Sequence, residues 1–133
     1  MKIKSYLHLF TEDVKKSRSF FEKSGFKIID DYSNEHGFCI EFTKYGYLMM
    51  LEKSHFQSFH KELNLADKDT HSSFLSIELG SKEQVDRLMK RVIKHGAIET
   101  DHAVDDDWVY YRSFKDLDMH QFEVFIMKSN IKK

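Results

Sequence analysis

The stretch from Trp108 to Met127 contains two runs of alternating aromatic, β-branched and polar residues, separated by a polar break at residues 115–118. This composition is typical of two strands joined by a turn. Side chains two residues apart share a face of a pleated strand. The residues expected on one face of the second strand are Gln121, Glu123, Phe125 and Met127. The pattern therefore predicts a β-hairpin that carries one carboxylate in the middle of a strand.

Glu123 is that carboxylate, and its neighbours along the strand are apolar. An ionised carboxylate is costly to bury unless a metal, a cation or several hydrogen-bond donors meet it. Glu123 is therefore a candidate functional residue. The alternative is a glutamate on an edge strand that faces water.

The first half of the chain shows the same alternation around one helix. Strands are expected at residues 6–10, 26–32, 38–43 and 47–51. Asp13 can accept a hydrogen bond from the first turn of a helix, and Ser24 with Gly25 is a helix-ending signal. Ser54 with Gln57 predicts a capping box. The short helix that this box would open carries Phe56, Phe59 and Leu63.

The second half repeats this order. A strand is expected at residues 74–79, and Ser81 with Gln84 forms a second capping box. The apolar positions that follow have helical spacing and are Val85, Leu88, Met89, Val92 and Ile93. Gly96 ends this helix, and residues 97–103 form a weak strand before the hairpin. Both halves thus read β-α-β-β-β, which is an internal repeat.

Composition narrows the class of protein. The 133 residues include 21 Lys and Arg against 22 Asp and Glu, and the net charge of −1 argues against a nucleic-acid-binding surface. No apolar run approaches the roughly 20 residues of a membrane span. Cys39 is the single cysteine and cannot form an internal disulfide. We expect a soluble cytoplasmic protein without nucleic-acid or membrane partners.

The turn of the hairpin carries a family resemblance. The run Asp116-Leu-Asp-Met-His120, followed by Glu123, resembles the Asp-Pro-Asp-Gly-His motif of the glyoxalase, bleomycin-resistance and extradiol-dioxygenase family, also called the vicinal oxygen chelate superfamily. Leu117 and Met119 replace the usual Pro and Gly. The segment 19–26, Ser-Phe-Phe-Glu-Lys-Ser-Gly-Phe, is similar to the end of the first helix of that family. The resemblance spans roughly residues 4–127.

This resemblance implies an α+β fold in which two βαβββ modules form curved mixed sheets around a cavity. We expect one domain over residues 1–133, with module one at 3–52, a connecting helix and linker at 53–71, and module two at 72–127. The resemblance and the aromatic content, which includes 12 Phe, also favour a homodimer.

The metalloenzymes of the family hold a divalent ion with His or Glu from the first and last strands of each module. The matching positions in this chain are Tyr6, Met50, residues 72–74 and Glu123. Of these, Glu123 alone is a competent ligand, so we expect no metal and no cofactor. A divalent metal ion is the alternative, if His8, two residues after Tyr6, replaces the missing ligand together with His71. The other interpretation of His8 is a hydrogen-bonded core residue.

The cavity that the resemblance implies would bind a small molecule. Its predicted lining is Tyr6, His8, Phe10, Leu48, Met50, Ser76, Glu78, Gln121, Glu123 and Phe125. Aromatic and thioether walls with a few polar groups are typical of such a site. If Glu78 and Glu123 both point inward, an organic cation is a suitable ligand. Alternatively Glu78, at the end of its strand, is solvated.

Three functions remain open from the sequence. The first is a metal-independent small-molecule-binding protein, either a sequestering protein or an enzyme in which His8 and Glu123 act as a general base and acid pair. The second is a metal-dependent lyase or dioxygenase of the glyoxalase type that uses the same two residues. The third is a structural dimer whose cavity is filled by its own side chains.

Overall fold

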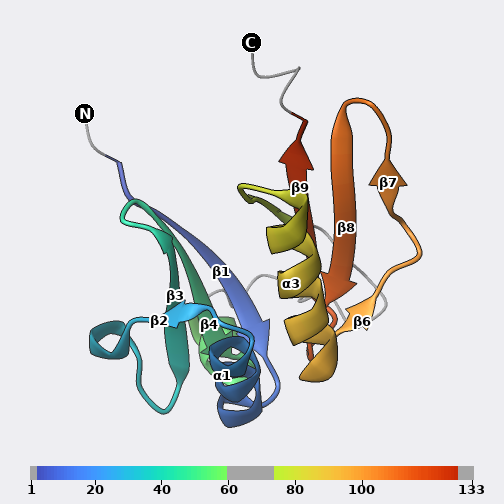
Figure 1. Ribbon diagram of the computed structural model, residues 1–133. Helices are drawn as coiled ribbons and strands as arrows, with labels where there is room; N and C mark the ends of the chain where they lie inside the picture. The colour runs from blue at the N-terminus through green and yellow to red at the C-terminus, as the bar shows by residue number, and fades with distance from the viewer. Residues whose placement is uncertain (1–2, 60–73, 129–133) are drawn as a thin grey trace. The chain divides into compact units, whose positions relative to one another are not determined.

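The computed structural model describes residues 3–59 and 74–128 (Figure 1). The chain divides into two compact units, residues 1–65 and 66–133. Each unit contains a mixed β-sheet with a helix on one face. The expected positions of Leu63, of the linker and of His71 lie outside the described residues.

Unit 1 is built on a four-stranded sheet. Its elements are β1 (Ser5–Thr11), α1 (Val14–Lys23), β2 (Lys27–Ile28), a 3-10 turn (Asp30–Tyr32), β3 (Gly37–Thr43), β4 (Gly46–Glu52) and α2 (Lys53–Phe59). The strand order is β1-β4-β3-β2. β1 and β4 are parallel, whereas β3 is antiparallel to both of its neighbours.

Unit 2 repeats this topology. Its elements are β5 (Phe74–Glu78), α3 (Lys82–Lys94), β6 (Ile98–Glu99), β7 (Val104–Asp105), β8 (Val109–Lys115) and β9 (Gln121–Met127). The strand order is β5-β9-β8-β6, with β7 also paired to β8. β5 and β9 are parallel, as β1 and β4 are in unit 1. The predicted α+β fold of two βαβββ modules is confirmed, as is the predicted hairpin.

The two long helices begin and end where the sequence predicts. Asp13 accepts a hydrogen bond from the Lys16 amide at 3.0 Å, and Ser81 accepts one from the Gln84 amide at 3.2 Å. Each helix is followed by a glycine with a positive φ, 97° at Gly25 and 114° at Gly96. A left-handed residue closes the end of a helix, and glycine adopts it without steric cost. No helix within the described ranges is long and apolar enough to cross a membrane.

Each helix packs on one face of the sheet of its own unit (Figure 1). In unit 1 the ring of Phe21 on α1 contacts Phe38 on β3 at a centroid distance of 6.0 Å. The fully buried side chains of the unit 1 sheet include Phe38, Ile40, Leu48 and Met50, and those of unit 2 include Phe114, Phe122 and Val124. These apolar faces form the two cores, because burying each large side chain contributes about 1.5–3 kcal/mol.

Three local predictions are wrong. The strand expected at residues 97–103 is formed only at Ile98–Glu99. The strand expected at residues 26–32 is paired only at Lys27–Ile28 and then turns into the 3-10 helix. The Ser33 hydroxyl donates to the Ile29 carbonyl at 2.7 Å and closes that turn. Ser54 does not cap α2, because the helix begins at Lys53; its hydroxyl donates to Glu52 Oε1 at 3.1 Å.

Candidate functional site

The face of the unit 2 sheet opposite α3, which we call the Glu123 face, carries the polar candidates of this unit. Strand register places on it Phe74, Ser76, Glu78, Tyr111, Ser113, Gln121, Glu123 and Phe125. Directly paired residues of neighbouring strands point to the same side of a sheet. The predicted face of β9 is therefore present, and Glu78 shares it with Glu123. The ligand-binding roles of Glu78, Gln121 and Phe125 remain predictions.

Two hydroxyl groups hold the carboxylate of Glu123. Ser76 on β5 donates to Oε1 at 2.6 Å, and Tyr111 on β8 donates to Oε2. Because β9 lies between β5 and β8, the two donors reach the carboxylate from opposite sides. Glu123 is half-buried. Two donors thus fix this carboxylate in place. Its environment is intermediate between the two that the sequence allowed, a buried charge and a glutamate facing water.

Tyr111 is the residue of this site that the sequence did not single out. Burial, followed by its hydrogen bond to Glu123, raises the pKa of Tyr111 to about 12. The phenol is therefore neutral at physiological pH and is the donor of the bond. The ring of His102 contacts the ring of Tyr111 edge to face at a centroid distance of 5.3 Å. Tyr111 is consequently held on two sides, by an imidazole and by the carboxylate.

The corresponding face of unit 1 is aromatic and sulfur-bearing. Tyr6, His8 and Phe10 share it, and their partners on β4 are Tyr47, Met49 and Leu51. The rings of Tyr6 and Tyr47 stack at 4.8 Å. The ring of Phe10 contacts Phe56 of α2 at 5.9 Å. The predicted face of β1 is thus present, with His8 exposed in its middle.

Met50 does not belong to this face. It pairs with Leu9 and Phe38, lies on the side covered by α1 and is 0% exposed. Its expected position in the ligand-binding face, and that of Leu48, is therefore wrong. The physical reason is the period of a strand: a shift of one residue moves a side chain to the opposite face.

Comparison of the two units gives the correct equivalence. His8 precedes the helix cap Asp13 by as many residues as Ser76 precedes the helix cap Ser81. The partner of His8 on the neighbouring strand is Met49, and the partner of Ser76 is Glu123. The repeat therefore places a thioether in unit 1 where unit 2 has a carboxylate.

The positions expected to hold a metal are divided between the two units. Tyr6 and Phe74 occupy the first strands, and His8 belongs to unit 1 whereas Glu123 belongs to unit 2. Within residues 3–59 and 74–128 no group of three or more His, Cys, Asp or Glu side chains is placed to hold a metal ion. The pairing of His8 with Glu123 as base and acid stays a prediction.

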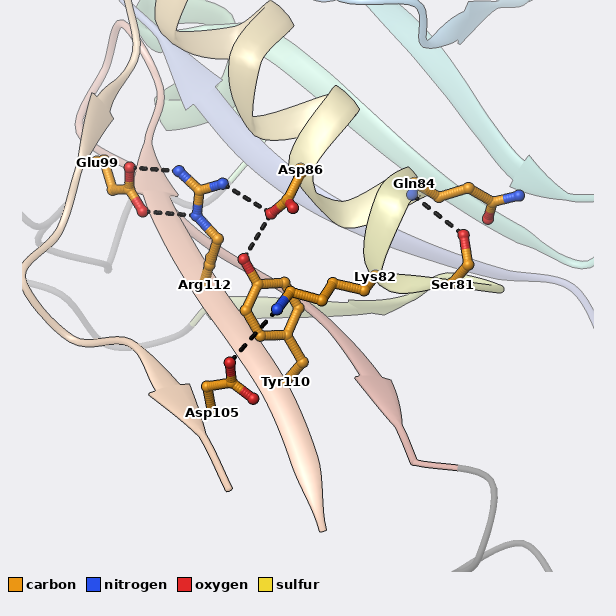
Figure 2. A network of polar contacts seen from close by, with 8 residues as sticks. All are labelled: Ser81, Lys82, Gln84, Asp86, Glu99, Asp105, Tyr110 and Arg112. Atoms are coloured by element: carbon orange, nitrogen blue, oxygen red, sulfur yellow. Dashed lines mark hydrogen bonds and ion pairs between the residues drawn. The ribbon is translucent and has the colours of Figure 1, made fainter. Parts of the chain in front are cut away.

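A second polar cluster lies on the opposite face of the unit 2 sheet, beside α3 (Figure 2). Arg112 donates to Glu99 through Nε at 2.8 Å and Nη2 at 2.7 Å, and to Asp86 through Nη1 at 3.0 Å. Tyr110 also donates to Asp86. The hydrogen bond from Tyr110 and the charge of Arg112 hold the pKa of Asp86 below its usual value. These groups satisfy one another and tie α3 to β6 and β8, so we assign the cluster to stability.

The turn that carries the family motif is built on Asp116. Its Oδ1 accepts the amides of Asp118 at 2.9 Å and His120 at 2.8 Å. The residue is 2% exposed, and its Oδ2 accepts no hydrogen bond from the described residues. Burial, with the nearby charge of Asp118, raises the pKa of Asp116 to about 8. Met119, which stands where the motif has glycine, has a φ of 67°.

Comparison of whole folds gives clear matches, whereas no family model and no curated protein matches the sequence. A hypothetical protein SA1046 from S. aureus matches with a TM-score of 0.79 and 24% identity, covering 95% of each chain. A glyoxalase/bleomycin resistance protein/dioxygenase family enzyme from Burkholderia phytofirmans matches at 0.78 with 18% identity, over 93% of this chain and 98% of that one. The fosfomycin resistance protein FosX from Listeria monocytogenes matches at 0.70 with 15% identity, over 100% and 99%.

Proposed function

We propose that this chain, which has the fold of the glyoxalase, bleomycin resistance and dioxygenase proteins, binds a small organic cation on the Glu123 face without a divalent metal. The proposal applies to the ligand and the site, since the shared fold hosts several unrelated functions. What supports it is the state of Glu123 together with its neighbours.

The carboxylate of Glu123 carries the proposal. Two hydroxyl donors hold it in a half-buried position, and no described Lys or Arg is among its hydrogen-bonding partners. A carboxylate fixed in this way retains an uncompensated negative charge, and each oxygen keeps capacity for one more hydrogen bond. A cationic ligand supplies both the missing charge and the missing donors.

Aromatic side chains around Glu123 favour an organic cation over a simple ion. Phe125 is adjacent on the same face of β9, Tyr111 lies beside it on β8, and Phe74 on β5 is 58% exposed. Ring faces attract cations, and the attraction is about 0.5–2 kcal/mol for each well-placed ring. Glu78 lies on the same face, where it pairs with Phe125 in the sheet. In this proposal Glu123 binds the charge of the ligand, and the neighbouring rings contact its organic part.

The proposal is tested by binding of matched cationic and neutral molecules. Benzylamine and benzyl alcohol have similar size and the same ring, but only benzylamine carries a charge at neutral pH. We expect benzylamine to raise the melting temperature of the protein and benzyl alcohol to leave it unchanged. Glu123→Gln should abolish the effect, whereas Glu83→Gln, an exposed change of the same kind on α3, should preserve it. Equal responses to the two molecules would refute the proposal.

The metal-dependent alternative has its own measurement. Protein purified without a metal-affinity tag is analysed for bound elements and melted with Zn, Ni, Mn or Fe(II) added. We expect no stoichiometric ion and no specific rise in melting temperature. A retained ion, lost in His8→Ala and in Glu123→Gln, would instead support the metal-dependent alternative, and assays of lyase and dioxygenase substrates would follow.

We also infer that the protein is a cytoplasmic homodimer. Apolar side chains exposed on the sheets support the dimer, with Tyr6 43% and Ile98 55% exposed. Exposed aromatic and aliphatic residues are enriched at subunit interfaces. Sedimentation velocity at several concentrations distinguishes the dimer from a monomer.

A further inference from the structure

The orientation of the Glu123 carboxylate carries information about the shape of the ligand. Oε1 accepts from Ser76 on one neighbouring strand and Oε2 accepts from Tyr111 on the other. With one oxygen anchored toward β5 and one toward β8, the carboxylate group cannot rotate about its last bond without losing both hydrogen bonds. Each oxygen keeps capacity for a second hydrogen bond, which a ligand can supply.

We propose that the Glu123 face selects a planar, fork-shaped cation, an amidinium or a guanidinium, over a tetrahedral ammonium. This inference rests on the proposed function and adds the class of ligand to it. A planar fork donates two parallel N–H bonds to the two oxygens of one carboxylate. A tetrahedral ammonium has no such pair of parallel donors, so it engages a fixed carboxylate less completely.

Fixing the carboxylate is what creates the preference. A freely rotating carboxylate can turn to meet any cation, and the ordering that a bidentate pair demands then opposes binding. Ser76 and Tyr111 impose this order before the ligand arrives. The fork of an amidinium therefore meets two acceptors that are already placed.

The same sheet contains a side-chain pair in which a planar guanidinium binds both oxygens of one carboxylate. On its other face Glu99 receives both Nε and Nη2 of Arg112, at 2.8 and 2.7 Å (Figure 2). The ring faces on the Glu123 side add a second reason, because planar guanidinium and amidinium groups stack on aromatic rings. Tyr111 and Phe125, which are direct partners on neighbouring strands, offer such rings beside Glu123.

The test compares three molecules with one ring and different head groups. Benzamidine is a planar cation, benzylamine is a tetrahedral cation, and benzamide is the neutral planar isostere of benzamidine. Dissociation constants are measured by isothermal titration calorimetry. We expect benzamidine to bind about tenfold more tightly than benzylamine, and benzamide not to bind.

Variants that release the carboxylate separate the shape of the ligand from its charge. Ser76→Ala and Tyr111→Phe leave Glu123 charged and remove one anchor each, so they should weaken benzamidine several-fold and leave benzylamine nearly unchanged. The ratio of the two constants should therefore fall toward one. Glu83→Gln, on the exposed face of α3, should leave the ratio as it is in the wild type.

Each outcome decides between the two proposals. Equal affinity for benzamidine and benzylamine would overturn the proposed preference for a fork-shaped cation. A ratio of their dissociation constants that neither anchor variant changes would do the same. Both results would leave the proposal of an organic-cation site unaffected. Binding of benzamide as tight as that of benzamidine overturns both, because charge would then play no part. Absence of binding by all three molecules, in protein shown to be folded by its melting curve, also overturns both.

Discussion

The hydroxyl of Tyr111 reaches diagonally from β8 to Oε2 of Glu123 on β9. The two residues are not direct partners in the sheet, because Tyr111 pairs with Phe125 and Glu123 pairs with Ser113. Ser113 is buried and its hydroxyl bonds to that of Thr100. The hydroxyl of Ser113 therefore bonds to Thr100 and not to Glu123. The longer side chain of Tyr111 provides the second hydrogen bond to the carboxylate.

Removing this anchor should cost stability. Tyr111→Phe keeps the ring and deletes the donor to a charged acceptor, and we expect the free energy of unfolding to fall by about 1–2 kcal/mol. Urea denaturation measures the change. Tyr32→Phe is the matched control, because Tyr32 is 52% exposed and should lose less than about 0.5 kcal/mol. Equal effects of the two changes would show that the bond to Glu123 contributes nothing.

The phenol of Tyr111 should ionise at a higher pH than that of an ordinary tyrosine. Its pKa is raised to about 12, so the folded protein keeps this proton through the range near pH 10 where the unfolded chain loses it. Its contribution to stability is therefore complete below pH 10 and is lost as the pH rises toward 12. Glu123→Gln removes the adjacent charge and should lower this pKa. Carbon NMR of labelled tyrosine rings follows the titration, and an unchanged Tyr111 curve in the variant would contradict the assignment.

Asp116 should make the protein less stable as the pH rises from about 4 to about 8. Its pKa in the folded protein is about 8 and that of the unfolded chain is near the ordinary 3.8. Between these values the folded state binds the proton and the unfolded state does not, so stability declines with rising pH. Asp116→Asn keeps the Oδ1 acceptor and removes the titration, and should flatten this part of the curve. Urea unfolding at intervals of pH measures it, and parallel curves for the two proteins would contradict the prediction.

Replacing Met119 with glycine should stabilise the protein. Its φ of 67° is left-handed, which costs a residue with a side chain roughly 1–2 kcal/mol relative to glycine. Allowing for the greater freedom of glycine in the unfolded chain, we expect Met119→Gly to stabilise by about 0.5–1 kcal/mol. Leu117→Gly, in the same turn and without a positive φ, is the control and should not stabilise. The melting temperatures of the two variants give the answer.

The helices and the hairpin could be predicted because their signals are local. Asp13 and Ser81 cap from within one turn, and the alternation of β9 runs unbroken through Glu123. The repeat was visible for the same reason. Met50 was placed on the wrong face because the prediction matched it to Glu123 across two hairpins whose turns differ in length, residues 44–45 against 116–120. A one-residue error of this kind inverts a strand face.

Other features depend on contacts that no local pattern reveals. The second strand ends early, in a turn where Arg18 of α1 pairs with Asp30. Tyr111 stands beside Tyr110, and only the register with β9 decides which of the two hydroxyls meets Glu123. The strand predictions therefore placed Glu123 and Ser76 on the correct face and missed Tyr111, the second hydrogen-bonding partner of the carboxylate.

The most direct test of the Glu123 site is an NMR titration of isotope-labelled protein with benzamidine. We expect saturable shifts centred on the amides of Ser76, Tyr111 and Glu123, on three adjacent strands, and their loss in Glu123→Gln. Saturable shifts centred elsewhere, or unchanged by that substitution, would contradict it.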